Sequence, residues 1–347
     1  MRVGILTGGG DCPGLNAVIR AAVRKGIFHH GDEFVGFMEG WRGVLEDKTM
    51  PLTIDTVSGI LHLGGTILRT SRTNARKKEG GIEQCIATIQ RNKLDAMITI
   101  GGDDTQGVAN ALVQKGVKCV GVPKTIDNDL SGTDVCFGFD TAVSIATEAV
   151  DRLHSTAEAH NRVIVCEVMG RDAGWIALYS GIAGGADAIL VPEKPIDLDE
   201  VCAIVKERHA RGKYFSIIVV AEGAKMPASG GLATHGDKVD EFGHARLAGI
   251  GQYVADEIEK RTGFETRAVN LGHTQRGGTP TAFDRMLATR YGSAAIDLVH
   301  QGKFGRLVVL RGTEITDIPL ADAIAKNKTV GDELLALGRG LQPILKK

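Results

Sequence analysis

Long apolar runs, paired metal-binding motifs and a surplus of one charge are all absent from this 347-residue sequence. Nothing approaches the roughly 18 consecutive apolar residues of a membrane span, and the apolar run within residues 1–7 is too short for a secretory signal. Lys and Arg number 41 against 42 Asp and Glu, which argues against nucleic-acid binding through bulk electrostatics. We therefore expect a soluble, cytoplasmic protein that binds neither membranes nor nucleic acid.

Cysteine pairs and aromatic residues are also scarce. The six cysteines are dispersed without a CxxC or CxxH pair, which is typical of reduced core residues; a metal site is the less favoured alternative. Aromatic residues make up 5% of the chain, whereas glycine occurs 46 times, about twice the usual share of roughly 7%. This glycine content indicates many tight turns and close backbone approaches. The length suits roughly two domains.

Short apolar segments rich in β-branched residues recur along the chain, each followed by turn residues and a helical pattern. A helix predicted over residues 140–160 takes Asp140 as its N-cap and carries an apolar stripe that includes Ala146 and Val150. Strand–helix alternation predicts parallel sheets with helices on both faces. The predicted strands are 2–7, 34–38, 95–100, 118–122, 162–168, 187–191, 215–221, 265–269 and 306–310.

Two glycine-rich loops follow predicted strands, where ligands of open α/β sheets bind. Residues 8–14 lead into a helix near Leu15, and free backbone N–H groups there suit a phosphate. The loop matches neither GxGxxG nor the Walker A pattern, so a structural turn is its alternative. The second loop, GGDDT at 101–105, adds two carboxylates that suit Mg²⁺ better than zinc. Helix N-capping by Asp103 or Asp104 is the alternative there.

A third loop after a predicted strand contains Lys124, Thr125, Asp127 and Asp129. Carboxylates at i and i+2 in an extended loop point the same way, with a lysine and a threonine just before them. This group could hold a hydroxyl, abstract its proton and neutralise an anion. A solvated acidic turn is the alternative, but it would not need the lysine and the threonine.

Basic residues and further loops complete the pattern. The basic run at residues 69–78 follows Gly-Gly-Thr at 64–66, which makes phosphate contact credible, although such runs are usually solvated faces. Later predicted strands are followed by MGR at 169–171, by Glu222 and by GHTQRGG at 272–278. His273 alone would suit a packed core, but beside Arg276 it favours an anionic ligand. Together the loops supply what phosphoryl transfer needs: cations, a carboxylate for Mg²⁺ and a base.

With GGGDCPG, TIDND, MGR and GHTQRGG in this order, the chain resembles 6-phosphofructokinase from its first strand to at least Gly278. The resemblance implies an α/β fold of two three-layer α/β/α domains with mostly parallel sheets and an active site in the cleft between them. It also implies phosphoryl transfer to the 1-hydroxyl of fructose 6-phosphate, in glycolysis or gluconeogenesis. The implied domains are 1–138 plus roughly 275–325 for the phosphoryl donor, and 139–274 plus the C-terminal tail for the sugar phosphate.

The resemblance also implies roles for residues that match the family's motifs. Asp127 is implied as the base, Arg171 as the residue that stabilises the transferred group, and Asp103 as the Mg²⁺ ligand. The implied supports of the transferring group are Thr125, Asp129 and Lys124. The implied donor contacts are Gly10, Arg72, Gly102, Asp104 and Lys124. The implied sugar-phosphate contacts are Thr125, Asp127, Asp129, Met169, Gly170, Arg171, Glu222, His273 and Arg276, with Arg162 and Arg267 from a neighbouring subunit, and hence a homodimer or homotetramer.

The donor is indicated by two departures from the ATP-using members. Those members resemble GGDGS or GGDGT in the second loop and PGTIDND in the third, whereas this chain has Asp104 and Lys124 in place of glycine. Both changes resemble the pyrophosphate-dependent branch. A carboxylate at position 104 would stand where a nucleotide's α-phosphate must pass, and Lys124 supplies a point charge for a compact diphosphate. Pyrophosphate is therefore the expected donor, and ATP is the alternative.

Three other functions are less consistent with the motifs. A kinase of the NAD-kinase kind shares the GGD loop but has no cause to carry TIDND or GHTQRGG. A non-catalytic sugar-phosphate sensor would be expected to lose Asp103 or Asp127, yet both are present. A nicotinamide oxidoreductase would need the glycine fingerprint that residues 8–14 do not match.

Overall fold

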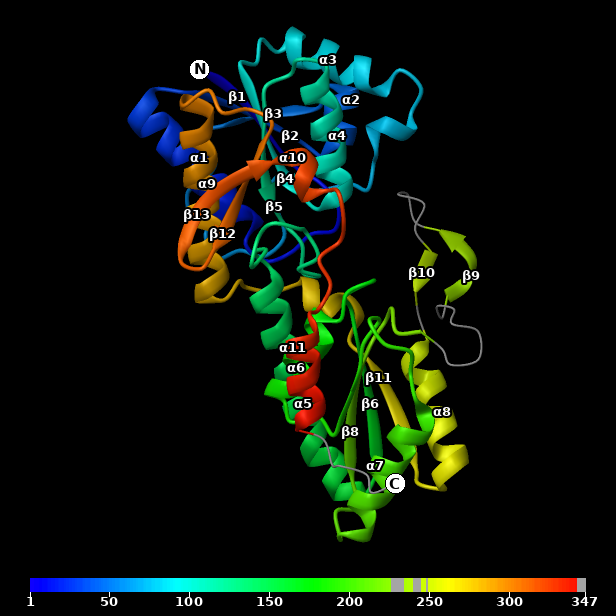
Figure 1. Ribbon diagram of the computed structural model, residues 1–347. Helices are drawn as coiled ribbons and strands as arrows, with labels where there is room; N and C mark the ends of the chain where they lie inside the picture. The colour runs from blue at the N-terminus through cyan, green and yellow to red at the C-terminus, as the bar shows by residue number, and fades with distance from the viewer. Residues whose placement is uncertain (226–233, 240–244, 248, 342–347) are drawn as a thin grey trace.

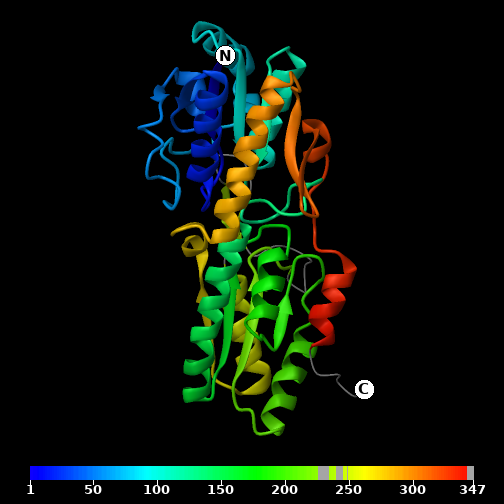
Figure 2. The same cartoon turned by 90° about the vertical axis from the view of Figure 1, so that its left-hand side faces the viewer.

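A computed structural model describes residues 1–225, 234–239, 245–247 and 249–341. Two sheets covered by helices lie at opposite ends of an elongated molecule (Figures 1 and 2). The larger sheet consists of β1 (Arg2–Thr7), β2 (Glu33–Phe37), β3 (Thr49–Leu52), β4 (Ala96–Gly101), β5 (Cys119–Pro123), β12 (Arg306–Arg311) and β13 (Glu314–Pro319). Their order is β13-β12-β5-β4-β1-β2-β3. The five inner strands are parallel, and the edge strands β3 and β13 are antiparallel to their neighbours.

Helices cover both faces of this larger sheet. On one face α1 packs against α9 so closely that a Cβ on Gly292 would collide with the carbonyl of Val18, and glycine alone permits this approach. The other face carries α2, α3 and α4 over a separate apolar cluster. The helices are α1 (Leu15–Lys25), continued by the π-helix η1 (Gly26–His30), α2 (Trp41–Glu46), the 3-10 helix η2 (Ala75–Lys77), α3 (Gly81–Arg91), α4 (Asp103–Gln114), α9 (Ala282–His300) and α10 (Leu320–Ala323).

The smaller sheet is wholly parallel and has the order β11-β6-β8-β7. Its strands are β6 (Val163–Val168), β7 (Ala188–Leu190), β8 (Ser216–Ala221) and β11 (Thr266–Asn270). The accompanying helices are α5 (Phe139–His160), α6 (Trp175–Ala183), α7 (Leu198–Ala210), α8 (Ile250–Thr262), the 3-10 helix η3 (Gly272–Arg276) and α11 (Asp332–Gly340). A separate antiparallel pair is formed by β9 (Thr234–Val239) and β10 (Ala245–Leu247).

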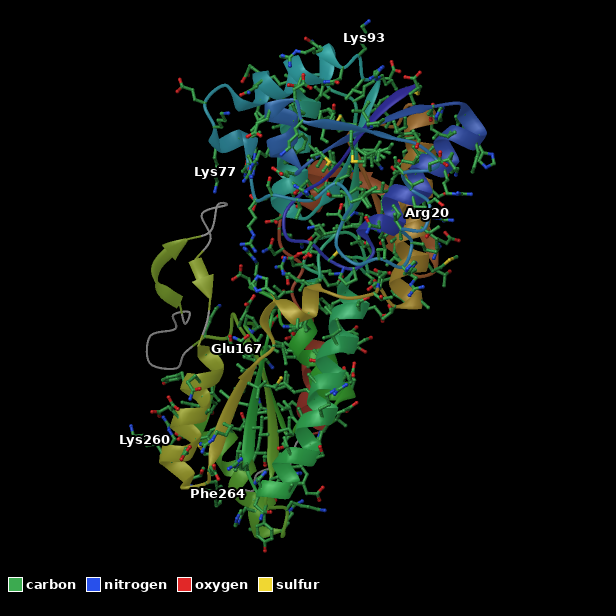
Figure 3. The ribbon with its side chains drawn as sticks, turned by 180° about the vertical axis from the view of Figure 1, so that it is seen from behind. Arg20, Lys77, Lys93, Glu167, Lys260 and Phe264 are labelled. Carbon is green, nitrogen blue, oxygen red and sulfur yellow. The ribbon has the colours of Figure 1, made fainter. Side chains whose placement is uncertain are left out.

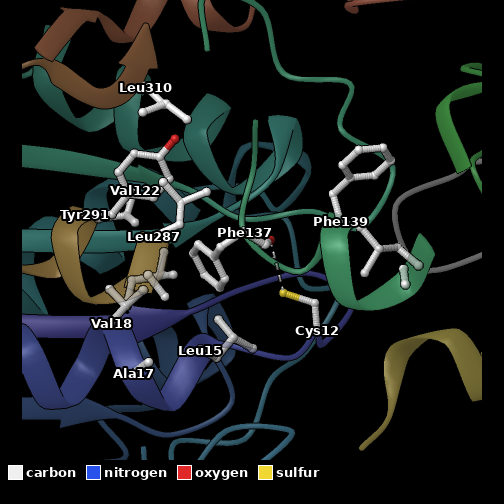
Figure 4. Packing of buried hydrophobic residues seen from close by; sticks show 14 of the residues in the cluster. Cys12, Leu15, Ala17, Val18, Val122, Phe137, Phe139, Leu287, Tyr291 and Leu310 are labelled. Atoms are coloured by element: carbon white, nitrogen blue, oxygen red, sulfur yellow. Dashed lines mark hydrogen bonds between the residues drawn. The ribbon is translucent and has the colours of Figure 1, made fainter. Parts of the chain in front are cut away.

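One apolar cluster extends from the larger sheet into the smaller one. It includes residues of β1, α1 and α9, continues through α5, and reaches β6 and β8. Figure 4 shows its middle, where Phe137 lies close to Leu15 and the Cys12 thiol donates to the Phe137 carbonyl at 3.7 Å. All six cysteines are free and buried, which confirms the expectation of core thiols.

The predicted fold class is confirmed, and each of the nine predicted strands is present within one residue of its expected bounds. The continuous apolar runs locate these strands well because a strand covered on both faces is apolar at every position. The prediction missed β3, β9, β10 and β13. For β3 and β13 the reason is physical: both are antiparallel edge strands with half-exposed residues and a proline, so they lack a continuous apolar run.

Two local predictions were wrong. The N-cap of α5 is Gly138 in the left-handed conformation, with φ of 96°, and Asp140 lies inside the first turn, where its carboxylate accepts the Thr281 hydroxyl at 2.6 Å. Residues 124–129 do not form an extended loop either, because the chain turns at Ile126–Asp127 and Asn128 is left-handed with φ of 53°. The domain boundaries stay a prediction, and residues 342–347 of the tail lie outside the described residues.

Candidate active site

The loops that follow β1, β4, β5 and β6 meet in one cavity between the two sheets. The carboxyl end of the smaller sheet faces the larger one: Figure 3 shows Glu167, near the end of β6, at the junction, and Lys260 and Phe264 at the far end. Eleven predicted site residues line the cavity: Gly10, Arg72, Gly102, Asp103, Asp104, Lys124, Thr125, Asp127, Asp129, Arg171 and Arg276. Loops far apart in the sequence therefore converge as expected for the carboxyl edges of parallel strands.

Two cations flank the backbone of the first loop. The buried Lys124 ammonium donates to the Gly10 carbonyl at 2.6 Å. The Arg276 guanidinium packs against Gly10, and a Cβ there would collide with it. Burial lowers the pKa of Lys124, and the nearby Arg276 charge adds to this lowering, whereas the Asp127 and Asp11 charges oppose it. The cavity thus concentrates positive charge beside the glycine backbone, as an anionic ligand requires.

The loop after β5 is held from within by Asn128. Its side-chain oxygen accepts the Cys136 backbone N–H at 2.9 Å, and its amide lies 3.4 Å from the Asp134 carbonyl. Asn128, between the two aspartates, has a left-handed backbone conformation, which asparagine adopts more readily than most residues. Both flanking residues, Asp127 and Asp129, line the cavity. Thr125 Oγ1 accepts the Asp127 N–H at 3.1 Å. A turn, and not extended backbone, therefore brings the two carboxylates together.

Carboxylates crowd this part of the site. Asp127 is 6% exposed, and its Oδ1 has no hydrogen-bond partner among the described residues. Burial, with the charges of Asp127 and Asp103, raises the pKa of Asp129 to about 7. Burial and the Asp127 charge likewise raise the pKa of Glu222 to about 7. Such shifts are typical of functional sites that bind cations or move protons.

Asp103 and Asp104 begin helix α4. The N-cap is Gly102, which has no side-chain capping bond, so neither aspartate caps the helix as the alternative interpretation required. Both lie in the first turn, where a negative charge is favoured by the helix dipole. Asp103 is exposed, whereas Asp104 Oδ1 accepts the Asn74 amide at 3.0 Å. Sequence reasoning missed Asn74, which is buried beside η2 and carries no motif of its own.

The remaining predicted residues do not line the cavity. Arg171 donates its backbone N–H to Glu222 at 3.3 Å, which places Glu222 just behind the cavity wall. The Met169 N–H donates to the Gln275 side-chain oxygen at 3.3 Å. Gly170 has a φ of 138°, a backbone conformation that glycine adopts readily. His273 is exposed on η3, so it is not a packed core histidine.

Arg162 and Arg267 lie far from the cavity within this chain. Arg162 precedes β6 and pairs with Glu265 at 2.8 Å, and Arg267 pairs with the same carboxylate at 2.6 Å. The loop at 169–171 leaves the other end of β6, about 20 Å away at roughly 3.3 Å per residue. Both arginines are therefore at the end of the smaller sheet opposite the cavity.

Six lining residues were not among the predicted site residues: Gly9, Asp11, Thr105, Ile126, Asp172 and Asn327. All of them except Asn327 lie within or next to a predicted motif, so their position was a usable signal. Asn327 belongs to a segment without motif or periodicity, and only the tertiary structure brings it to the site. In the described part of the chain, no group of three or more His, Cys, Asp or Glu is arranged to hold a metal, and no helix is long and apolar enough to cross a membrane.

Solved structures share this fold. A Pichia pastoris phosphofructokinase structure described as the T-state matches with a TM-score of 0.82 at 30% identity; the match covers 98% of this chain and 36% of that longer chain. A pyrophosphate-dependent phosphofructokinase from Marinobacter aquaeolei has a TM-score of 0.82 at 22% identity, over 96% of this chain and 86% of that one, a likeness of fold alone.

Sequence relatives are more similar. A Streptomyces coelicolor protein named pyrophosphate–fructose 6-phosphate 1-phosphotransferase is 59% identical over 96% of this chain and 97% of its own length. An ATP-dependent 6-phosphofructokinase 3 of the same organism is 54% identical over 96% of this chain and 97% of its own. The sequence model of the family Phosphofructokinase matches residues 2–299. With that match and these relatives, the chain belongs to the phosphofructokinase family.

Proposed function

We propose that this protein transfers a phosphoryl group from pyrophosphate to the 1-hydroxyl of fructose 6-phosphate, reversibly, giving fructose 1,6-bisphosphate and phosphate. The observation that carries the proposal is the buried Asp127, whose unpartnered carboxylate oxygen shares a cavity with Lys124 and Arg276. A base beside clustered cations is the arrangement that phosphoryl transfer to an alcohol needs. The relative that is 59% identical carries the name of this reaction.

Asp127 is proposed to accept the proton of the sugar hydroxyl as that oxygen attacks phosphorus. The Thr125 hydroxyl, which accepts the Asp127 N–H, fixes the turn and can donate its own hydrogen to a phosphate oxygen. Arg171 and Arg276 line the same cavity and would stabilise negative charge on the transferred group. Asp129, Met169, Gly170, Glu222 and His273 are proposed to complete the sugar-phosphate side.

Pyrophosphate is favoured over ATP by the loop after β4. Asp104 adds a carboxylate to the first turn of α4, and the Asn74 amide bonded to it holds that carboxylate in place. A nucleotide must pass this charge with its α-phosphate, whereas pyrophosphate ends before it. Gly10, Arg72, Gly102 and Lys124 line the same cavity and are proposed to contact the diphosphate.

A divalent cation fits the residues present. Mg²⁺ in phosphoryl-transfer sites commonly takes one or two carboxylates, substrate oxygens and waters. The exposed Asp103 in the cavity wall and Asp129, whose pKa the Asp103 charge helps to raise, match this donor set. When bound, Mg²⁺ would neutralise charge on the phosphate oxygens. Arg162 and Arg267, which cannot reach the cavity in their own chain, are proposed to serve a neighbouring subunit of a homo-oligomer.

A donor assay tests the proposal directly. Purified protein is given fructose 6-phosphate and Mg²⁺ with either pyrophosphate or ATP, and fructose 1,6-bisphosphate is measured. We expect kcat/KM with pyrophosphate to exceed that with ATP by at least tenfold. A preference for ATP would replace the proposed donor with the alternative, and no product with either donor would refute the proposed reaction.

A further inference from the structure

A four-residue segment at 327–330 links the two halves of the molecule beside the cavity. It belongs to the connection that runs from α10 at the larger sheet to α11 at the smaller one (Figures 1 and 2). None of the family motifs in this chain includes it. We propose that this segment, the strap, positions the loop that carries Asp127 and Asp129 against the start of α6, with Lys328 as its positioning residue; the inference rests on the proposed function.

The backbone of the strap contacts the loop after β5, which carries Asp127 and Asp129. The Lys328 N–H donates to the Asp129 carbonyl at 2.7 Å, and Asn327 forms an antiparallel bridge with Leu130. Just before the strap, the Lys326 carbonyl accepts the buried Ser131 hydroxyl at 2.8 Å. Three consecutive residues of the loop, 129–131, are thus held from outside, in addition to the internal anchoring by Asn128.

The other side of the strap contacts the smaller-sheet half. The Trp175 indole N–H, at the start of α6, donates to the Lys328 carbonyl at 2.9 Å. Glu193 Oε1 accepts both the Val330 N–H and the Gly174 N–H, each at 2.9 Å. Gly174 and Trp175 follow Arg171 and Asp172 of the cavity wall by only a few residues. The strap therefore joins the loop after β5 to the loop after β6.

Lys328 takes part in both sets of contacts. Its ammonium donates to the carbonyls of Thr133 and Asp134, each at 2.9 Å, and lies 5.1 Å from the centre of the Trp175 ring. Two of the three ammonium donors are thus used in hydrogen bonds, and the charge lies over the Trp175 ring. Next to Lys328, Asn327 lines the cavity itself. Because a misplacement of about 1 Å can lower a rate by roughly 10²-fold, loosening this residue should affect the chemical step.

The main test compares matched variants. Lys328→Met removes the ammonium and keeps the stem, Lys326→Met makes the same change on an exposed side chain next to the strap, and Lys328→Arg restores a cation. With saturating substrates we expect Lys328→Met to lower kcat about 10–100-fold, with each KM changed less than about threefold. Lys326→Met should stay within twofold of the parent, and Lys328→Arg should recover part of the loss. Equal kcat in the two methionine variants would overturn the proposal.

A double-mutant cycle separates positioning from general destabilisation. Trp175→Phe removes the N–H to the strap carbonyl and keeps an aromatic ring. If Lys328 and Trp175 act through the same strap, the double variant should lose less kcat than the product of the two single losses. If the loss of kcat in the double variant equals the product of the two single losses, the two residues act independently, which would contradict the proposed role of the strap.

A spectroscopic measurement keeps the proposal testable without activity. The sequence has two tryptophans, so in a Trp41→Phe background Trp175 is the single indole. Lys328→Met should shift its emission relative to that background, whereas Lys326→Met should not. Equal emission in all three proteins would disprove the contact. A failed donor assay with the wild type would instead refute the proposed reaction and leave this result intact.

Discussion

At the scale of single residues, Asp127 combines a place in the cavity wall with an unpaired carboxylate oxygen. It is nearly buried, yet one carboxylate oxygen has no hydrogen-bond partner in the described part of the chain. Buried polar atoms are nearly always paired because an unmade hydrogen bond costs about 1–3 kcal/mol. An oxygen left unpaired at a cavity wall is therefore available to a ligand, and a sugar hydroxyl is the partner that the proposed reaction supplies.

The first prediction concerns Asp127→Asn. The amide keeps the shape but cannot accept the proton, so kcat should fall by roughly 10²–10⁴-fold with little change in sugar binding. Steady-state kinetics check kcat, and equilibrium binding of fructose 6-phosphate checks affinity. The control is Asp134→Asn in the same loop: the exposed Asp134 accepts the Gly312 N–H, which an amide oxygen can also do. Near-normal turnover of Asp127→Asn would remove Asp127 from the role of base.

The second prediction concerns Asp104→Gly. At about 4 Å from an α-phosphate the carboxylate would cost roughly 4 kcal/mol at an effective dielectric of about 20. Screening reduces this to about 2–4 kcal/mol, or roughly 30–10³-fold against ATP. We expect the glycine variant to bind ATP more tightly by a factor in this range, measured by calorimetry. An unchanged ATP affinity would mean that Asp104 does not select the donor.

Lys124 is expected to limit how well the Asp104→Gly variant can use ATP. Its ammonium holds the Gly10 carbonyl at 2.6 Å, so it shapes the first loop as well as carrying charge. Full catalysis with ATP is expected to need Lys124→Gly in addition to Asp104→Gly. Lys124→Gly alone should weaken pyrophosphate binding, because it removes a cation and releases the Gly10 carbonyl together.

At the scale of elements, the N-termini of α5 and α9 meet at Asp284. This fully buried carboxylate accepts the Thr141 N–H at 2.8 Å and the Thr141 hydroxyl at 2.6 Å. Burial nevertheless raises the pKa of Asp284 to about 6. The folded chain therefore retains a proton that the unfolded chain, with a pKa near 3.9, has released. The contribution of Asp284 to the free energy of unfolding is therefore fully present below about pH 4 and is lost as the pH rises through about 6.

The third prediction follows from this loss of stability with rising pH. Asp284→Asn removes the ionisation whose full cost approaches 3 kcal/mol, although a weaker hydrogen bond from Thr141 offsets part of the gain. We expect about 1–2 kcal/mol of added stability at pH 8, or roughly 2–4 °C in melting temperature, and little gain at pH 5. Thermal unfolding at the two pH values measures this. A gain of the same size at both would contradict the assigned pKa shift.

At the scale of the whole molecule, two predicted site residues lie away from the cavity of their own chain. Arg162 and Arg267 are paired with Glu265 at the end of the smaller sheet away from the cavity. The two arginines cannot reach the cavity of their own chain by changing side-chain conformation, because the length of β6 separates them from it. If two subunits pack together through this end of the sheet, each could present its arginines to the cavity of the other. A symmetric interface would then serve two sites at once.

The fourth prediction tests shared sites by complementation. Arg162→Ala and Asp127→Asn are each expected to be inactive as pure oligomers. A mixed oligomer contains one site with neither change, so activity should return after subunit exchange. Mass spectrometry of differently tagged protomers verifies the exchange. Verified exchange without recovered activity would place both residues in the same site of one chain.

Much of the fold, and most of the residues that line the cavity, could be predicted from the sequence. Inner strands are apolar on both faces because helices cover both sides of a parallel sheet, so β1, β4, β6 and β8 were visible as continuous apolar runs. Motif residues such as Asp127, Lys124 and Arg276 were found because the turn that follows a strand carries the chemistry in this kind of fold.

The contacts that hold these loops in place could not be predicted from the sequence. Asn74 against Asp104, Arg276 against Gly10 and Lys328 between Asp129 and Trp175 are contacts across 30 to 266 positions of sequence. Their partners carry no shared periodicity or motif, because distant segments meet through the packing of whole sheets and helices. The turn at Asn128 is decided in the same way, since its side chain must find Cys136 and Asp134 before the two aspartates converge.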